Sequence, residues 1–189
     1  MNEPVFWLAP FAAVLALYFA WRFFREIRRQ DQGTETMREI GAHIHKGAMA
    51  YLRQQYKIML VVFALIAGLF AYLAYGLGVQ NPWLPATFVL GGFFSALAGY
   101  VGMQTATMAS TRTTAAARTS LAGALRIAFR SGAVMGLVVV GLGLGNLAFW
   151  FILVHLLTPG DPGDGAYLVL VTTTVLTFSM GASMQALFA

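Results

Sequence analysis

The chain has 189 residues, of which 59% are hydrophobic and only 10% are charged, and its net charge is +5. Soluble domains average about 25% charged residues, so this composition excludes an ordinary soluble protein and indicates a membrane protein. The absence of Cys excludes disulfides, thiolate chemistry and Cys-ligated metals. The positive charge flanks apolar segments, so membrane topology and anionic lipid headgroups explain it better than nucleic acid does.

Five apolar segments, taken in chain order, are long enough to cross a bilayer, which requires about 20 residues of helix. The first is not a cleavable signal peptide, because Glu3 precedes its apolar core and the Arg residues follow it. The predicted class is therefore an all-α integral membrane protein, with residues 1–189 forming a single polytopic segment. The predicted spans lie at about residues 5–24, 58–79, 83–108, 127–157 and 166–189.

The basic residues fall in two stretches, eight of them in residues 22–57 and four in residues 112–130. Lys and Arg are retained on the cytoplasmic side of a membrane. This pattern predicts cytoplasmic loops at about residues 25–57 and 109–126. The N-terminus is then expected outside, and the C-terminus is expected at the cytoplasmic face.

The first cytoplasmic loop carries a helical pattern. Thr36 with Glu39 three residues later fits a capping box, and apolar residues then recur at helical spacing. An amphipathic helix that runs into the second span is expected, although Gly41 and Gly47 weaken it. The second loop, which is rich in Ala with Arg at intervals, is also expected to be largely helical.

Two pairs in the first loop have the chemistry of metal ligands but simpler explanations. His43 and His45 are two residues apart, and such residues point to different sides of a helix, so they are predicted to be solvated surface residues. Glu35 and Glu39 share a helical face and could hold Mg²⁺, but helix capping and a contact with the helix dipole explain them more simply. No metal ligand is predicted in this chain.

Two further motifs resemble sites that bind anions. Arg126 and Arg130 are four residues apart, so their guanidinium groups could grip a phosphate, but anchoring at a lipid headgroup layer explains them more simply. Residues 141–146 read GLGLGN, yet a dinucleotide fingerprint requires a preceding strand, and these glycines lie inside a span. No catalytic or substrate-binding residue is predicted.

The apolar cores of the five spans contain no Asp, Glu or Lys. Ionisable groups inside a membrane mark ion pathways and proton relays, so these helices alone are not expected to conduct protons. Pairs of small residues four apart, which allow helices to pack closely, recur in the third and fourth spans. The pairs are Gly92 with Ala96, Ser95 with Gly99, Ala98 with Gly102, Gly132 with Gly136, and Gly141 with Gly145.

The fifth span is the most polar. Hydroxyl and amide side chains in a span seek partners on other helices or in a watery cavity, so this span is the best candidate for an inner helix of a larger bundle. It ends at Ala189 without a polar tail, which suggests a truncated chain. Its polar residues are Thr172, Thr173, Thr174, Thr177, Ser179, Ser183 and Gln185.

Four stretches of the chain are distinctive in sequence. They are residues 40–56 (IGAHIHKGAMAYLRQQY), 99–118 (GYVGMQTATMASTRTTAAAR), 128–137 (AFRSGAVMGL) and 180–189 (MGASMQALFA). In order and spacing they resemble the membrane-bound, ion-translocating inorganic pyrophosphatases over about residues 37–189. Arg112, Arg118 and Arg130 match positions of that family, with no ground for calling them substrate ligands.

The resemblance implies a larger, homodimeric protein in the plasma membrane. It implies hydrolysis of Mg-pyrophosphate at the cytoplasmic face, coupled to outward pumping of H⁺ or Na⁺, with Mg²⁺ as cofactor. The first four spans would be outer helices, and the fifth would open an inner ring. Because the family's Asp-rich, Lys-containing substrate signature would follow Ala189, this chain is expected to be an N-terminal fragment that is inactive alone.

Two alternatives stay open on the sequence. The chain could be a complete small membrane protein that serves as an assembly subunit without catalysis. It could also be a small oligomeric transporter that passes a neutral solute through a cavity lined by the hydroxyls of the fifth span. Whether a pump of this kind would move H⁺ or Na⁺, and whether it would require K⁺, is left open.

Overall fold

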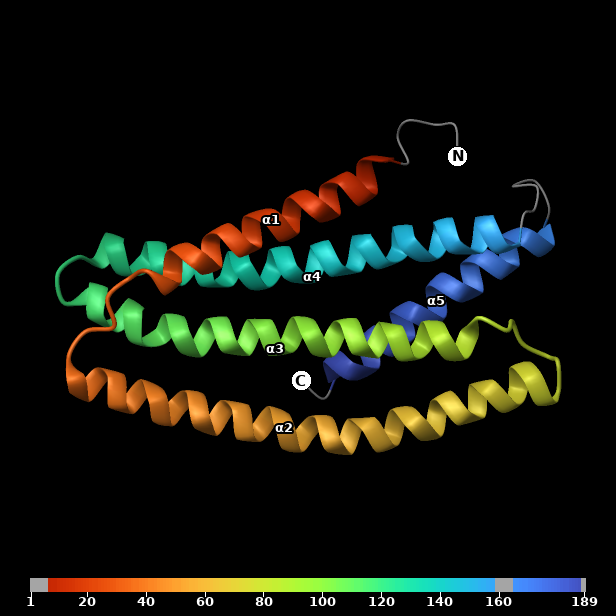
Figure 1. Cartoon of the computed structure of the whole chain (residues 1–189), viewed down its shortest axis with the longest axis horizontal. Helices are drawn as coiled ribbons and strands as arrows, with labels where there is room; N and C mark the ends of the chain where they lie inside the picture. The colour runs from red at the N-terminus through yellow and green to blue at the C-terminus, as the bar shows by residue number, and fades with distance from the viewer. Residues whose placement is uncertain (1–6, 159–164, 188–189) are drawn as a thin grey trace. The chain divides into compact units, whose positions relative to one another are not determined.

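The computed structural model describes residues 7–158 and 165–187, and within these ranges it contains helices and no strands. Each long helix of this described part is long and apolar enough to cross a membrane, if α2 and η2 are counted as one helix. This confirms the predicted class of an all-α membrane protein with five spans. The elements are α1 (Leu8–Arg28), α2 (Glu35–Ala71), the π-helical turn η2 (Tyr72–Gly76), α3 (Leu84–Ala117), α4 (Leu121–Leu157) and α5 (Gly165–Leu187) (Figure 1).

Several helices are longer than a membrane requires. The 37 residues of α2 extend over about 55 Å at 1.5 Å per residue, whereas the hydrocarbon core is about 30 Å thick. The prediction that a helix in the first loop runs into the second span is therefore confirmed, since both form one continuous element. Only residues 118–120 separate α3 from α4, so the predicted helical character of the second loop is also confirmed. The predicted outer limits at residues 5 and 189 lie outside the described residues.

The start of α2 differs from the prediction. The hydroxyl oxygen of Thr34, rather than that of Thr36, accepts a hydrogen bond from the backbone N–H of Met37 at 3.4 Å. Gly33 precedes the helix with φ +82°, and its N–H donates to the carboxylate of Asp31 at 3.1 Å. This left-handed turn, which favours Gly, starts the helix before Thr36, so the predicted capping box at Thr36 is wrong.

The chain forms two compact units, and the boundary between them falls inside α2, α3 and α4. Unit 1 comprises residues 1–54 and 98–142, and unit 2 comprises residues 55–97 and 143–189. Unit 1 thus contains α1 with the first part of α2, the last part of α3 and the first part of α4. Unit 2 contains α5 with the remaining parts of those three helices.

The core of unit 1 is built from α1, α3 and α4. Ile27 of α1, Ala109 of α3 and Val134 of α4 are buried in one apolar cluster. Beside it, the guanidinium of Arg130 on α4 donates to the carboxylate of Glu26 on α1 at 2.7 Å. Both side chains are partly exposed, so this ion pair contributes little stability by itself and mainly fixes the register of the two helices.

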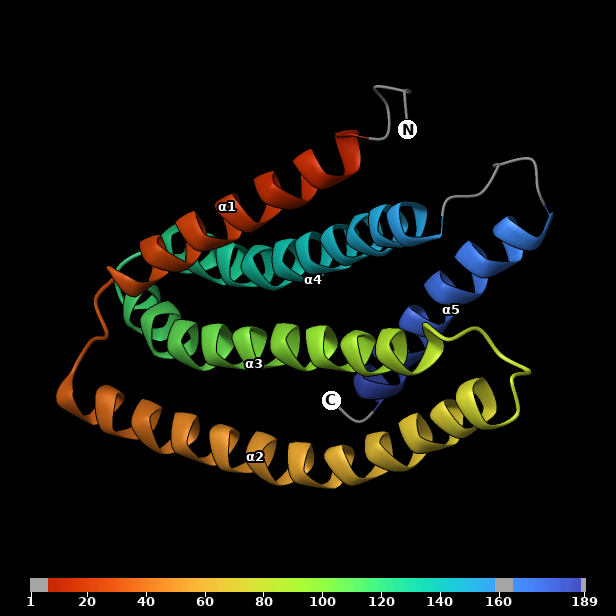
Figure 2. The same ribbon diagram turned by 45° about the vertical axis from the view of Figure 1, so that its right-hand side comes forward.

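The core of unit 2 is built around α5. Trp150 and Val154 of α4 are buried against Phe178 of α5. Helix α5 crosses α3 in both views of the ribbon (Figures 1 and 2). At the crossing the helices touch through backbone, because a Cβ placed on Gly181 would collide with the carbonyl oxygen of Phe88 on α3.

The predicted small-residue packing is confirmed at some positions and not at others. A Cβ placed on Gly132 or Gly136 would meet no other part of the described structure within 4 Å, so the prediction of packing is not met there. The packing also uses Gly91, which no predicted pair contained and which lies against the carbonyl oxygen of Phe178. The confirmed contacts are Gly92 with Phe63, Gly102 with Met135, and Gly141 with Leu17.

Substitution of Gly181 tests the helix crossing in unit 2. Gly181→Ala should destabilise the protein by about 1–3 kcal/mol, because the new methyl group forces two backbones apart. Gly136→Ala is the matched control, since its Cβ would enter open space and Ala favours helix. Thermal unfolding in detergent measures both variants, and equal midpoints for the two would contradict the crossing.

Candidate functional site

Unit 1 contains a polar cavity of about 590 Å³ bounded by α1, α2 and α3. It lies where the C-terminal end of α1, the N-terminal part of α2 and the C-terminal part of α3 come together (Figure 1). No acidic residue is among the side chains that line it. Its polar lining consists of Arg28, Gln32, Arg38, His45, Gln104, Thr107, Thr111 and Arg112.

Arg112 is the most buried charged residue of this cavity, with 5% of its surface exposed. Its Nη1 donates to the carbonyl oxygen of Met108 at 2.8 Å, one turn back on α3. Its Nη2 donates to the carbonyl oxygen of Arg28, the last residue of α1, at 3.3 Å. The buried Nε has no partner in the described structure. The guanidinium therefore ties α3 to the end of α1 while keeping unused hydrogen-bonding capacity.

His45 joins α2 to α3 at the same cavity. Its Nδ1 lies 2.9 Å from the hydroxyl of Thr107, and Thr107 also donates to the carbonyl oxygen of Met103 at 2.9 Å. One turn earlier on α2, Gly41 lies against Thr111, so the two helices approach closely at this point. The prediction that His45 is a solvated surface residue is wrong, because it is half-buried and hydrogen-bonded. His43 is exposed as predicted.

The other residues singled out in the loops do not converge on a site. Glu35 and Glu39 are exposed at the start of α2. No group of three or more His, Asp or Glu side chains lies together in the ranges that the structure describes. Arg126 is exposed, whereas Arg130 is paired with Glu26. The structure therefore does not bring Arg126 and Arg130 together as a phosphate clamp.

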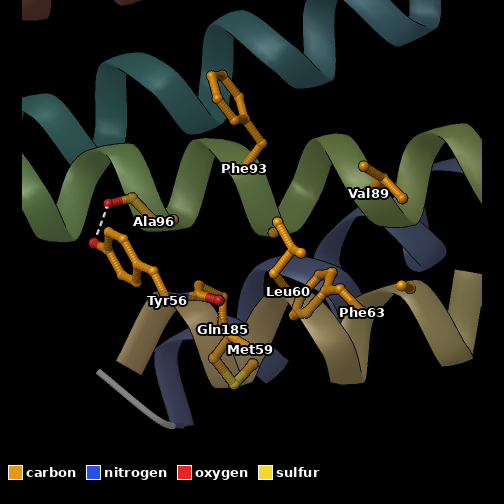
Figure 3. A pocket seen from close by; sticks show the side chains of 10 residues that line it. Tyr56, Met59, Leu60, Phe63, Val89, Phe93, Ala96 and Gln185 are labelled. Atoms are coloured by element: carbon orange, nitrogen blue, oxygen red, sulfur yellow. Dashed lines mark hydrogen bonds between the residues drawn. The ribbon is translucent and has the colours of Figure 1, made fainter. Parts of the chain in front are cut away.

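Unit 2 contains an apolar pocket of about 370 Å³ lined by α2 and α3 and reached by the end of α5. Figure 3 shows Met59, Leu60 and Phe63 around it, together with Gln185. The hydroxyl of Tyr56 at its edge donates to the carbonyl oxygen of Ala96 at 2.6 Å (Figure 3). Such a wall of apolar side chains is the kind of surface that packs against lipid or another helix.

Gln185 is the polar exception in that pocket. It is 4% exposed, and its Nε2 has no hydrogen-bond partner in the described structure. Three threonines of α5 meet the prediction of outside partners only in part. The hydroxyls of Thr173, Thr174 and Thr177 donate to carbonyl oxygens one turn back on α5 itself. Their own helix therefore accepts each hydroxyl proton, whereas the hydroxyl oxygens of Thr173 and Thr174 also accept from Asn81 outside α5, as the prediction expected.

Asn81 is the residue that the sequence patterns did not reveal. Its side-chain amide donates to the hydroxyl of Thr174 at 2.8 Å and to the carbonyl oxygen of Leu170 at 3.2 Å. Its side-chain oxygen accepts from the backbone N–H of Trp83 at 2.9 Å. One side chain thus fixes the turn just before α3 and ties that loop to α5. Its position before Pro82 in a short turn was the available signal.

The contribution of Asn81 to stability can be tested by comparing its substitution with that of Tyr75. Asn81→Ala should lower stability by about 1–3 kcal/mol, since it removes the hydrogen bonds to Leu170, Thr174 and Trp83. Tyr75→Phe is the matched control, because it removes one exposed hydrogen bond, to the carbonyl oxygen of Pro82, in the same loop. Thermal unfolding in detergent should therefore show a clear loss for the first variant and little for the second. Equal losses would contradict the assigned role.

The helices and cavities are those of a polytopic helical membrane protein. All its Lys and Arg residues except Lys57 lie in unit 1. A family model described as inorganic H⁺ pyrophosphatase matches residues 14–189. This match covers nearly the whole chain, so the chain belongs to that family.

Curated relatives agree with this assignment. The chain is 55% identical, over its full length, to a protein of Bacteroides thetaiotaomicron named "Putative K(+)-stimulated pyrophosphate-energized sodium pump". It is 37% identical over 99% of its length to a "K(+)-insensitive pyrophosphate-energized proton pump" of Methanosarcina mazei. The chain spans 26% of the length of the first relative and 25% of the second.

Proposed function

We propose that this chain is the N-terminal portion of a pyrophosphate-energised ion pump. In the whole protein, hydrolysis of Mg-pyrophosphate at the cytoplasmic face drives outward transport of an ion. The observation that carries this proposal is the match of the whole chain to relatives named as such pumps. The long apolar helices support it, because the pump must hold its site in a membrane.

In this proposal the described helices supply a framework for the pump. We propose that the whole pump uses Mg²⁺ as its cofactor. In proteins, Mg²⁺ is held by carboxylates together with phosphate oxygens. The described residues do not fit such a site, since no cluster of acidic side chains occurs in them. We propose that the groups that bind metal and pyrophosphate come from the part of the pump outside this chain.

We propose Na⁺ as the pumped ion, with stimulation by K⁺. The identity of 55% to the relative named as a K⁺-stimulated sodium pump exceeds the 37% to the relative named as a proton pump. A Clostridium tetani relative that also carries the sodium-pump name is 44% identical over 67% of this chain. A proton pump is the second candidate, and ion-uptake measurements separate the two.

We propose that the N-terminus faces outward, in the plasma membrane, and that the whole protein is a homodimer. The grouping of basic residues in 22–57 and 112–130 supports this orientation. An assembly subunit or a carrier of neutral solutes, the alternatives from the sequence, would couple no ion movement to pyrophosphate.

Activity measurements test the proposed function directly. Inside-out vesicles that contain the full-length protein should hydrolyse pyrophosphate with Mg²⁺ and accumulate Na⁺, faster when K⁺ is present. Residues 1–189 alone, reconstituted in proteoliposomes, should hydrolyse none. Hydrolysis by residues 1–189 alone would contradict the proposal that the hydrolytic groups lie outside this chain. Hydrolysis by the full-length protein without ion uptake would contradict the proposal that it is a pump.

Single-cysteine labelling tests the proposed orientation, because the chain contains no native Cys. Gln80→Cys, in the loop before α3, should react with a membrane-impermeant maleimide in intact cells. Thr119→Cys, in the turn between α3 and α4, should react only after the cells are permeabilised. The reverse pattern would show that the protein has the opposite orientation.

A further inference from the structure

Arg112 is a buried cation without a counter-ion in the described structure. The ion pair of the described residues joins Arg130 to Glu26 and leaves Arg112 with no carboxylate in contact. Burying a charge is costly unless another charge or a full set of hydrogen bonds compensates it. The two hydrogen bonds of Arg112 go to neutral carbonyl groups, and its Nε has no partner.

The cavity beside Arg112 adds positive charge instead of compensating it. Arg28 and Arg38 line the same space, and no Asp or Glu does. Both are more exposed than Arg112, so the cavity presents one buried guanidinium and two accessible ones. Its volume of about 590 Å³ lies within the range of ligand sites. The planar fork of Arg matches the oxygens of a phosphate group.

Capping of α1 does not account for this arrangement. The carbonyl oxygen of Arg28 is one of the unpaired groups at the end of α1, and a cation there stabilises the helix dipole. That contact explains only one nitrogen of Arg112. It leaves the Nε unused, and it gives no reason for Arg28 and Arg38 to line the same cavity, where three like charges repel each other.

We propose that this cavity binds a phosphate group, with Arg112 as its buried donor and with Arg28 and Arg38 closing around it. One source is the headgroup of an anionic phospholipid, because basic segments near a membrane attract the anionic leaflet. The other source is free inorganic phosphate. The inference rests on the geometry of unit 1 and on no step of the proposed pump cycle.

Thermal unfolding of the full-length protein, delipidated in neutral detergent, tests the site. The midpoint is measured with phosphatidylcholine alone, with added phosphatidylglycerol, and with sodium phosphate against sodium chloride at equal ionic strength. A ligand that binds the folded state raises the midpoint. Arg38→Gln should raise the half-saturating ligand concentration about tenfold, as expected for the loss of one charge-assisted hydrogen bond.

Arg118→Gln is the matched control, because Arg118 is exposed and does not line the cavity.

Arg112→Gln should abolish the rise in unfolding midpoint on addition of ligand. If the Arg112 variant does not fold, the Arg38 variant still tests the site, because Arg38 is exposed. A response to phosphatidylglycerol alone identifies a lipid, and a response to inorganic phosphate identifies the free anion. No response, or equal responses of the Arg38 and Arg118 variants, overturns the proposal.

Discussion

The fold depends on one constraint: inside hydrocarbon, every backbone N–H and C=O must be paired within the protein. A continuous helix meets that requirement residue by residue, which explains why the apolar segments form long helices. The buried threonines obey the same rule, since Thr105 and Thr174 donate to carbonyl oxygens of their own helices at 2.7 Å. Helix contact then relies on shape, as at Gly181, because apolar surface gains little by leaving lipid.

Six buried side-chain atoms of the described residues have no partner: one is the Nε of Arg112 in unit 1, and the other five lie in unit 2. Gln55, Asn146, Trp150 and Gln185, all in unit 2, have side-chain nitrogen or oxygen atoms without partners among the described residues. Buried polar groups in native proteins are nearly always paired. Amide side chains in membrane helices hydrogen-bond across helices, and Gln55, Asn146 and Gln185 have this capacity unused among the described residues.

The sequence predicted the elements well because element formation depends on local properties. Apolar length and helical period predicted the five helices and the long extension of α2. The site could not be predicted in the same way, because it depends on distances across the chain. The bond between His45 and Thr107 joins residues 62 positions apart, and the burial of Arg112 depends on the end of α1. The cap of α2 was misplaced because the left-handed turn at Gly33 overrides the Thr36 pattern.

Charge separates the roles of the two units. Of the basic residues, only Lys57 falls in unit 2, and all the others fall in unit 1. Charged side chains resist burial in hydrocarbon, so the charged helix ends of unit 1, unlike its apolar span α1, suit contact with lipid phosphate groups. Unit 2 presents apolar surface and a few amides, which suits contact with further helices. The polar cavity and the apolar pocket thus follow from the same distribution of charge along the sequence.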